Sequence, residues 1–112
     1  MTVTATLFAV MRTRGPAWND AVPLEEQVDW RRHADFMNAL HDEGVAVLAG
    51  PVGGTRDVLL IFRAECAAAV EARLAEDCWS VQGLLRTLWI KPWELRLGAL
   101  GPRRRSRGSG SV

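Results

Sequence analysis

The segment VAVLAGPVGGTRDVLLIFR, residues 45–63, decides the fold of this chain of 112 residues. Two runs rich in β-branched and aliphatic residues, Val45–Ala49 and Val58–Arg63, flank the glycine-rich turn Gly50–Gly54. This pattern predicts an antiparallel β-hairpin. Because the turn links two strands and opens no helix, it lacks the amide dipoles of a phosphate-binding loop. The glycine-rich segment is therefore predicted to be a turn between two strands rather than a phosphate-binding site.

A helix is predicted before the hairpin, over Leu24–Glu43. Pro23 suits a first helical turn, two glutamates follow it, and Gly44 suits the stop. At helical spacing His33 shares one face with Phe36 and two further apolar residues. We therefore expect His33 to point toward the core.

The N-terminal part predicts a buried strand over Thr4–Arg12, followed by a long loop over Thr13–Val22. Loops of that length in compact domains often form lids or rims of sites. Trp18 in this loop is either part of such a rim or a buried anchor.

After the hairpin, the alanine-rich segment Cys66–Glu76 predicts a second helix. Ser80 is expected to cap a short turn that runs through Leu85. Thr87–Leu97 alternates as a last strand, and Pro92 within it implies a sheet edge or a bulge.

The resulting order, β-α-β-β-α-β, predicts an α+β ferredoxin-like fold, a four-stranded antiparallel sheet with two helices on one face. Strand residues too apolar for solvent on both faces are Leu7, Ala9, Leu60, Phe62, Trp89 and Trp93. A chain of this size buries only about two thirds of its unfolded surface. We therefore expect a homodimer in which a second copy covers the bare face.

Composition places one domain over residues 1–98 and a disordered Arg/Gly/Ser-rich tail over residues 99–112. The net charge of +1 includes four arginines in the last ten residues, so the preceding residues sum to −3. A folded, mildly acidic body argues against a nucleic-acid partner. The tail itself is either a solubilising end or a weak contact for an acidic partner or RNA.

Cys66 and Cys78 have neither a CxxC spacing nor a histidine cluster around them, which argues against a disulfide framework and a metal site. No apolar run approaches the about 18 residues of a membrane span, and no export signal is evident. The expected protein is cytoplasmic, with no membrane partner and no cofactor.

Several short motifs in order resemble a known family. They are Arg32-His33-Ala34-Asp35-Phe36, then Gly44, Ala49-Gly50-Pro51, Asp77-Cys78-Trp79 and Pro92-Trp93. Over about residues 4–98 the chain is similar to YCII-related domains of the dimeric α+β barrel superfamily. It departs from them where Cys78 and Trp79 replace the usual proline and phenylalanine or tyrosine, and in its longer Arg12-to-Val22 insertion.

The resemblance implies a dimeric α+β barrel in which the residues matching His33 and Asp77 form a dyad in a pocket of each subunit. One activity in that group is dehydrochlorination of an aromatic degradation intermediate. The resemblance thus implies cofactor-independent lyase, isomerase or cyclase chemistry on a small cyclic or aromatic substrate.

The residue types fit acid/base catalysis, because an imidazole takes a proton and a carboxylate on its other nitrogen fixes the tautomer. His33 and Asp77 are the catalytic candidates; the alternative is a buried structural histidine and a helix-end cap. The candidates for substrate binding are Trp79, Arg12, Arg14, Trp18, Phe36 and Pro51.

Each candidate also has a structural reading. The tryptophans suit an aromatic ligand or ordinary core packing, and the two arginines suit an anionic or phenolate oxygen or a solvated strand end. His41 is expected to be a solvated cation at the helix end. A nucleophilic role for Cys78 is disfavoured by its neighbouring carboxylate.

Three other functions stay open at this point. A cofactor-free monooxygenase of the same barrel superfamily would use the same base but consume oxygen. A non-catalytic small-molecule-binding or assembly protein would use the histidine only structurally. Haem binding would need an axial ligand such as His33 and would produce a visible absorption band.

Overall fold

The structure is a computed structural model that describes residues 6–100. The first residues of the predicted N-terminal strand and most of the predicted tail, from position 101 onward, lie outside the described residues. Within them, no helix is both long and apolar enough to cross a membrane.

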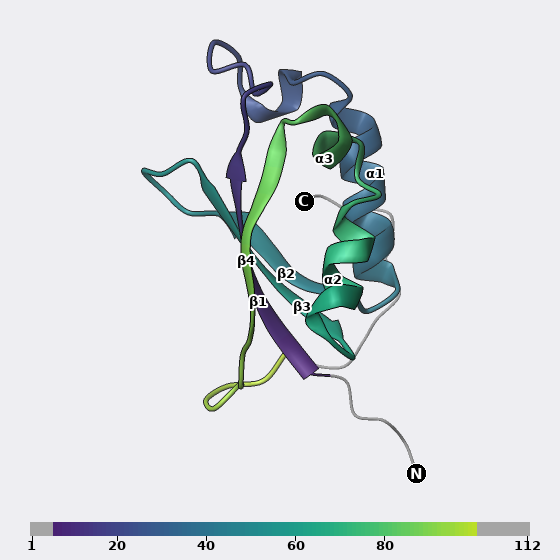
Figure 1. Cartoon of the computed structure of the whole chain (residues 1–112). Coiled ribbons are helices and arrows are strands. Elements are labelled where there is room, and N and C mark those ends of the chain that lie inside the picture. Colours follow the sequence, from purple (N-terminus) through teal and green to yellow (C-terminus); the bar gives the residue numbers. More distant parts are fainter. Residues whose placement is uncertain (1–5, 101–112) are drawn as a thin grey trace.

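Four strands form one antiparallel sheet in the order β2-β3-β1-β4. They are β1 (Thr6–Arg14), β2 (Ala46–Pro51), β3 (Asp57–Ala64) and β4 (Leu85–Pro92). The helices are α1 (Trp30–Asp42), α2 (Ala67–Leu74) and α3 (Cys78–Gln82), with a 3-10 turn η1 (Leu24–Glu26) before α1. All three α-helices lie on the same side of the curved sheet (Figure 1). The predicted ferredoxin-like α+β fold is confirmed.

The predicted helix over residues 24–43 is wrong in its first part. Only η1 forms there, and α1 begins six residues later, at Trp30. Asp29 adopts a left-handed backbone conformation, with a φ of 57°, which breaks a helical hydrogen-bond ladder. The buried Gln27 side chain bonds the backbone of Asn19 and the carbonyl of Val22 instead, so the segment before α1 folds onto the preceding loop.

Other boundaries differ by a few residues. The short turn predicted from Ser80 is α3, which begins at Cys78, because Asp77 and not Ser80 is its N-cap. The last strand begins two residues earlier than predicted and ends at Pro92 rather than at Leu97. The proline therefore terminates the strand at a sheet edge, as a residue without a backbone N–H should.

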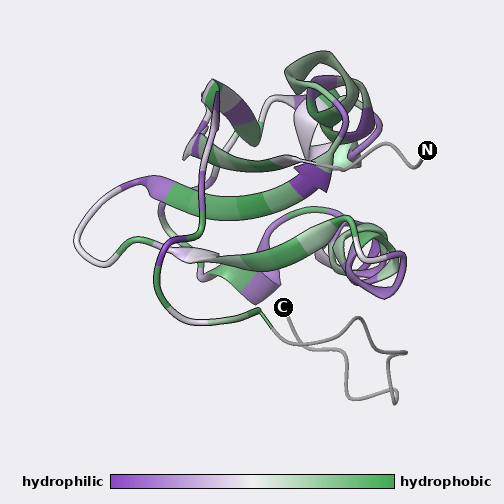
Figure 2. Ribbon diagram, turned by 90° about the horizontal axis from the view of Figure 1, so that it is seen from below, coloured by the Kyte–Doolittle hydropathy of each residue, from purple (hydrophilic) through white to green (hydrophobic). Residues whose placement is uncertain are grey.

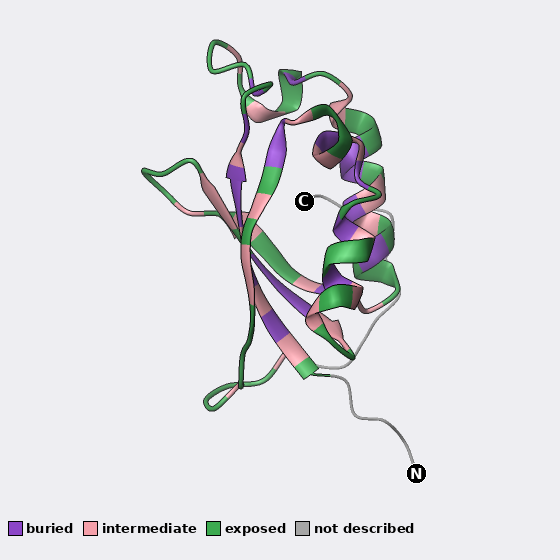
Figure 3. Cartoon of the chain, viewed as in Figure 1, coloured by how far each residue is buried: buried purple, intermediate pink, exposed green. Residues whose placement is uncertain are grey.

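The core lies between the sheet and the helices. Figure 3 shows buried residues both on the strands and on the helices that cover the sheet, and Figure 2 shows the apolar character of the strands. The residues of the main buried cluster are Phe8, Val10, Met37, Leu40, Ala46, Leu60, Phe62, Val70 and Leu74. The predicted strand residues Leu60 and Phe62 thus belong to the helix-covered face.

The opposite face of the sheet carries apolar side chains that no element of the described chain covers. Met11 of β1 lies opposite Leu59 of β3 on one side and opposite Trp89 of β4 on the other. Because residues paired across neighbouring strands share a face of the sheet, all three lie on this face. Leu59 and Leu48 are exposed in the single chain. Leu7, Ala9 and Trp89 from the prediction alternate with the buried strand residues, as expected of this face.

A bulge interrupts the pairing of β1 with β4. Met11 pairs with Trp89, whereas the next residue, Arg12, pairs with Thr87, so Leu88 is an extra residue of β4. Because of it, Leu85 lies opposite Arg14 at the helix-covered face, next to the site described below. The bulge lies at Leu88 and not at Pro92, so the proline meets the edge alternative of the sequence prediction.

Candidate active site

Asp77 lies between α2 and α3, and its carboxylate is fully buried. Its backbone is extended, and its Oδ1 atom accepts the backbone N–H of Trp79 at 3.1 Å. An aspartate at this position satisfies one of the free N–H groups at a helix start. The residue is thus a helix cap, as the structural interpretation predicted, but this contact uses only part of its acceptor capacity.

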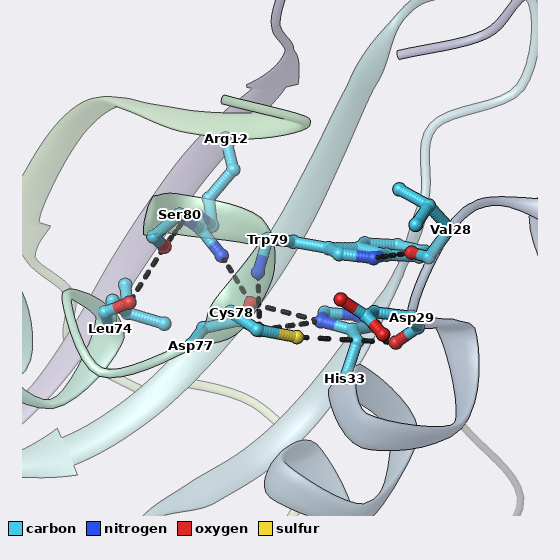
Figure 4. A network of polar contacts seen from close by, with 9 residues as sticks. All are labelled: Arg12, Val28, Asp29, His33, Leu74, Asp77, Cys78, Trp79 and Ser80. Carbon is cyan, nitrogen blue, oxygen red and sulfur yellow. Dashed lines mark hydrogen bonds and ion pairs between the residues drawn. The ribbon is translucent and has the colours of Figure 1, made fainter. Parts of the chain in front are cut away.

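His33 reaches Asp77 from α1, as the helix phase predicted. The Nδ1 atom lies 3.0 Å from Oδ1 and 2.9 Å from Oδ2 of the carboxylate, and His33 is only 8% exposed (Figure 4). The two residues are 44 positions apart in the chain. An ionised carboxylate only accepts hydrogen bonds, so Nδ1 carries the proton. In the neutral ring the Nε2 atom then has the free lone pair.

The plane of the His33 ring is fixed by Trp79. The two rings are stacked, with centroids 3.9 Å apart and planes within 7°. The indole is held in turn, because Nε1 donates to the Val28 carbonyl at 2.6 Å and Trp18 packs edge-on at 5.4 Å. Figure 4 shows the indole and imidazole lying one above the other.

Arg12 is not at a solvated strand end, because it is only 2% exposed. Its Nη1 atom lies 3.3 Å from Oδ2 of Asp77, and Nη2 donates to the hydroxyl of Ser80, which donates to the Leu74 carbonyl at 2.7 Å. Burial lowers the pKa of the Arg12 guanidinium, and the charge of Asp77 partly opposes this. Arginine stays charged even so. Arg12 therefore serves as the counter-ion of the buried carboxylate.

A cavity of about 200 Å³ opens beside the dyad. Its lining comes from the loop, η1, α1, α3 and all four strands: Arg12, Arg14, Trp18, Leu24, Trp30, His33, Met37, Ala49, Gly50, Pro51, Val58, Leu60, Trp79 and Leu85. Most of these side chains are apolar. A hollow of this kind with few polar groups is the usual form of a small-molecule site.

The cavity contains most of the predicted site residues. Trp79, Arg12, Arg14, Trp18, Pro51 and His33 all line it. Trp18 is both a buried anchor and a wall, so the two interpretations of this residue hold together. Asp77 lies behind His33 and does not reach the cavity.

Phe36 is the exception, because the structure does not bring it to the cavity with the other predicted substrate contacts. It packs against the main core cluster and does not line the cavity. Along α1 the cavity wall is formed by the predicted catalytic residue His33 together with Trp30 and Met37, which were not among the predicted site residues. Ser80 was predicted only as a helix cap; its bond to Arg12 joins segments that are 68 residues apart.

The other two predicted titratable residues have local roles. The Nδ1 atom of His41, which is exposed, lies 2.8 Å from the Ala46 carbonyl and ties the end of α1 to β2. Burial, and then the charge of Asp77, raises the pKa of the Cys78 thiol. That direction opposes a thiolate, as the sequence indicated. Across residues 6–100 there is no group of three or more His, Cys, Asp or Glu side chains that would hold a metal ion.

Comparison with family models, curated proteins and solved structures finds no match to this chain. The resemblance to YCII-related domains therefore stays a prediction from the sequence motifs. The function must be argued from the geometry of the site.

Proposed function

We propose that this protein is a cofactor-independent enzyme of the lyase, isomerase or cyclase type, with His33 as the general base and acid and Asp77 as its orienting carboxylate. One observation carries the proposal. The Nδ1 atom is held by a buried carboxylate, while Nε2 has no hydrogen-bond partner among residues 6–100 and His33 lines an apolar cavity. A histidine with only a structural role would be expected to use both ring nitrogens once buried.

The chemistry follows from this arrangement. The Nε2 lone pair accepts a proton from a substrate carbon acid, and the electron pair of the broken C–H bond moves into the substrate. The imidazolium that forms is stabilised by Asp77, whose other partners, Arg12 and the Trp79 N–H, keep it in place. Returning the proton to another carbon gives isomerisation; loss of a leaving group from the adjacent carbon gives elimination.

The cavity sets the size of the substrate. Benzene occupies an engineered apolar cavity of about 150 Å³, so a hollow of about 200 Å³ accommodates one ring with small substituents. Trp18 and Trp79 both line the cavity and contribute apolar surface to its walls. These walls support a cyclic or aromatic substrate of single-ring size.

The test is proton abstraction, measured without knowledge of the product. The protein is incubated in deuterium oxide with a panel of small cyclic carbon acids, such as unsaturated lactones and cyclic ketones, and exchange is followed by NMR. General acid–base catalysis contributes about 10²–10⁴-fold, so His33→Gln should lose activity by that factor. His41→Gln is the matched control, since His41 lies at the other end of the same helix.

The outcomes separate the alternatives. Equal exchange by His33→Gln and the unchanged protein, or no exchange with any member of the panel, would refute the proposal and favour a binding or assembly role. Consumption of dissolved oxygen during turnover would instead assign the site to the monooxygenase class.

The uncovered apolar face supports a second part of the proposal, that the protein is a homodimer. Leu48, Leu59 and Trp89 lie on that face without a covering element in the described chain. Contiguous apolar patches of this kind commonly mark association surfaces. Sedimentation velocity at several concentrations measures the oligomeric state directly, and a monomer at all concentrations would exclude the dimer.

A further inference from the structure

Positive side chains outnumber negative ones in the lining of the cavity. Arg12, Arg14 and His33 reach it, and its lining contains no aspartate or glutamate. Asp77, behind His33, compensates one positive charge only. A ligand that enters this cavity therefore meets one guanidinium in excess, in surroundings that are otherwise apolar.

The two arginines differ in what they bind. The Nη atoms of Arg12 donate to Asp77 and Ser80, and its Nε–H is buried without a hydrogen-bond partner among residues 6–100. The charge of Arg12 is thus already paired with Asp77, and its side chain is only 2% exposed. Arg14 is half-buried, and within residues 6–100 its guanidinium has neither an acidic partner nor a hydrogen-bond acceptor.

The position of Arg14 is fixed without using its donors. It ends β1, where its backbone N–H donates to the Arg56 carbonyl at 3.0 Å. Its guanidinium carbon lies 4.5 Å from the ring centre of Trp18, a cation–π contact that uses no hydrogen-bond donor. The N–H groups at the guanidinium edge remain free for a planar oxyanion, which arginine binds in two parallel hydrogen bonds.

We infer that Arg14 is the specificity-determining residue of the site and that the substrate is a single-ring compound with one carboxylate or other planar oxyanion. The inference rests on the proposed function, because it concerns the substrate of the same cavity. The oxyanion pairs with Arg14, the ring lies among the apolar side chains of the cavity, and His33 Nε2 acts on a ring carbon. Arg12 contributes only through Asp77.

Equilibrium binding tests the inference without turnover. Small ring carboxylates, namely benzoate, cyclohexanecarboxylate and 2-furoate, are titrated against their neutral carboxamides, with calorimetry and tryptophan fluorescence as readouts, since three tryptophans line the cavity. A charge-assisted hydrogen-bond pair predicts a preference for the carboxylate of about tenfold to a hundredfold. Arg14→Gln should remove the preference, and Arg14→Lys should retain part of it.

Arg31→Gln is the matched control, since the Arg31 side chain is 77% exposed on α1 and its one ion pair within residues 6–100 is with Asp35. It should bind as the unchanged protein does, and thermal melts of each variant confirm that it is folded. Equal affinity for acid and amide, no binding across the panel, or an unchanged preference in folded Arg14→Gln would overturn the inference. If His33→Gln also loses proton exchange in deuterium oxide, any of these results would refute only the proposed substrate class and would leave the proposed acid–base function supported.

Discussion

Replacing Asp77 by asparagine isolates the charge of the buried carboxylate from its shape. The amide oxygen still accepts the Trp79 N–H at the start of α3 and the N–H of His33, and asparagine caps helices about as well as aspartate. What is lost is the negative charge beside Arg12, together with the Oδ2 acceptor of the Arg12 Nη1 atom, whose place the amide NH2 group takes. Arg12 and Asp77 are 2% and 0% exposed, so water cannot replace the missing partner.

The expected cost follows from that burial. Removing one partner of a buried ion pair destabilises a protein by about 3–5 kcal/mol, because the other charge stays uncompensated. With a urea slope of about 1.5 kcal/mol/M, the unfolding midpoint should fall by about 2–3 M. Asp35→Asn, which breaks the exposed pair with Arg31, should cost at most about 0.5 kcal/mol.

Urea titration followed by tryptophan fluorescence measures both variants, since Trp18 and Trp79 are buried. A double variant, Arg12→Met with Asp77→Asn, provides the decisive comparison. Replacing a buried ion pair by neutral groups is often nearly neutral, so the double variant should be more stable than Asp77→Asn alone. A loss below about 1 kcal/mol for Asp77→Asn, or a double variant less stable than that single one, would refute the reasoning.

Two further predictions concern packing and the thiols. Gly15→Ala should destabilise the protein by about 2 kcal/mol or more, because an added Cβ would lie 2.3 Å from the backbone oxygen of Gly83. Gly53→Ala is the control and should not destabilise it, because a Cβ there would have no atom within 4 Å. Urea unfolding midpoints compare the two variants, and equal midpoints would contradict the close approach at Gly15. Burial and the Asp77 charge raise the pKa of Cys78 above its ordinary value of 9.0, so its contribution to stability is present below that pH and is lost as the pH rises through the higher folded value. Iodoacetamide at pH 8 should therefore modify exposed Cys66 before Cys78, and equal rates in the folded protein, read by peptide mass spectrometry, would contradict this.

Much of the fold was predictable because local patterns and topology agree. Apolar runs at strand spacing and the hairpin at residues 45–63 gave the correct strand count and pairing. The side of α1 that carries His33 followed from a 3.6-residue period. The meeting of His33 with Asp77 came from the family resemblance, since no local rule brings together residues 44 positions apart.

The remaining differences have tertiary causes. The helix predicted from Leu24 fails because Gln27 bonds the preceding loop and Asp29 takes a left-handed conformation, and neither choice has a local signature. Phe36 was misplaced because a helix face several residues wide serves both the core and the cavity. The burial of Arg12 could not be foreseen, since an arginine at the end of a strand is usually solvated and only the fold brings a carboxylate to it.

The extra residue of β4, Leu88, has a consequence for how this site tolerates changes in length. Side chains alternate between the two faces of a strand, so a single inserted residue exchanges the faces for everything on one side of it. Without the extra residue, Arg86 rather than Leu85 would pair with Arg14, and a second arginine would replace an apolar residue of the cavity lining. The bulge in the edge strand β4 thus keeps this part of the cavity beside His33 apolar.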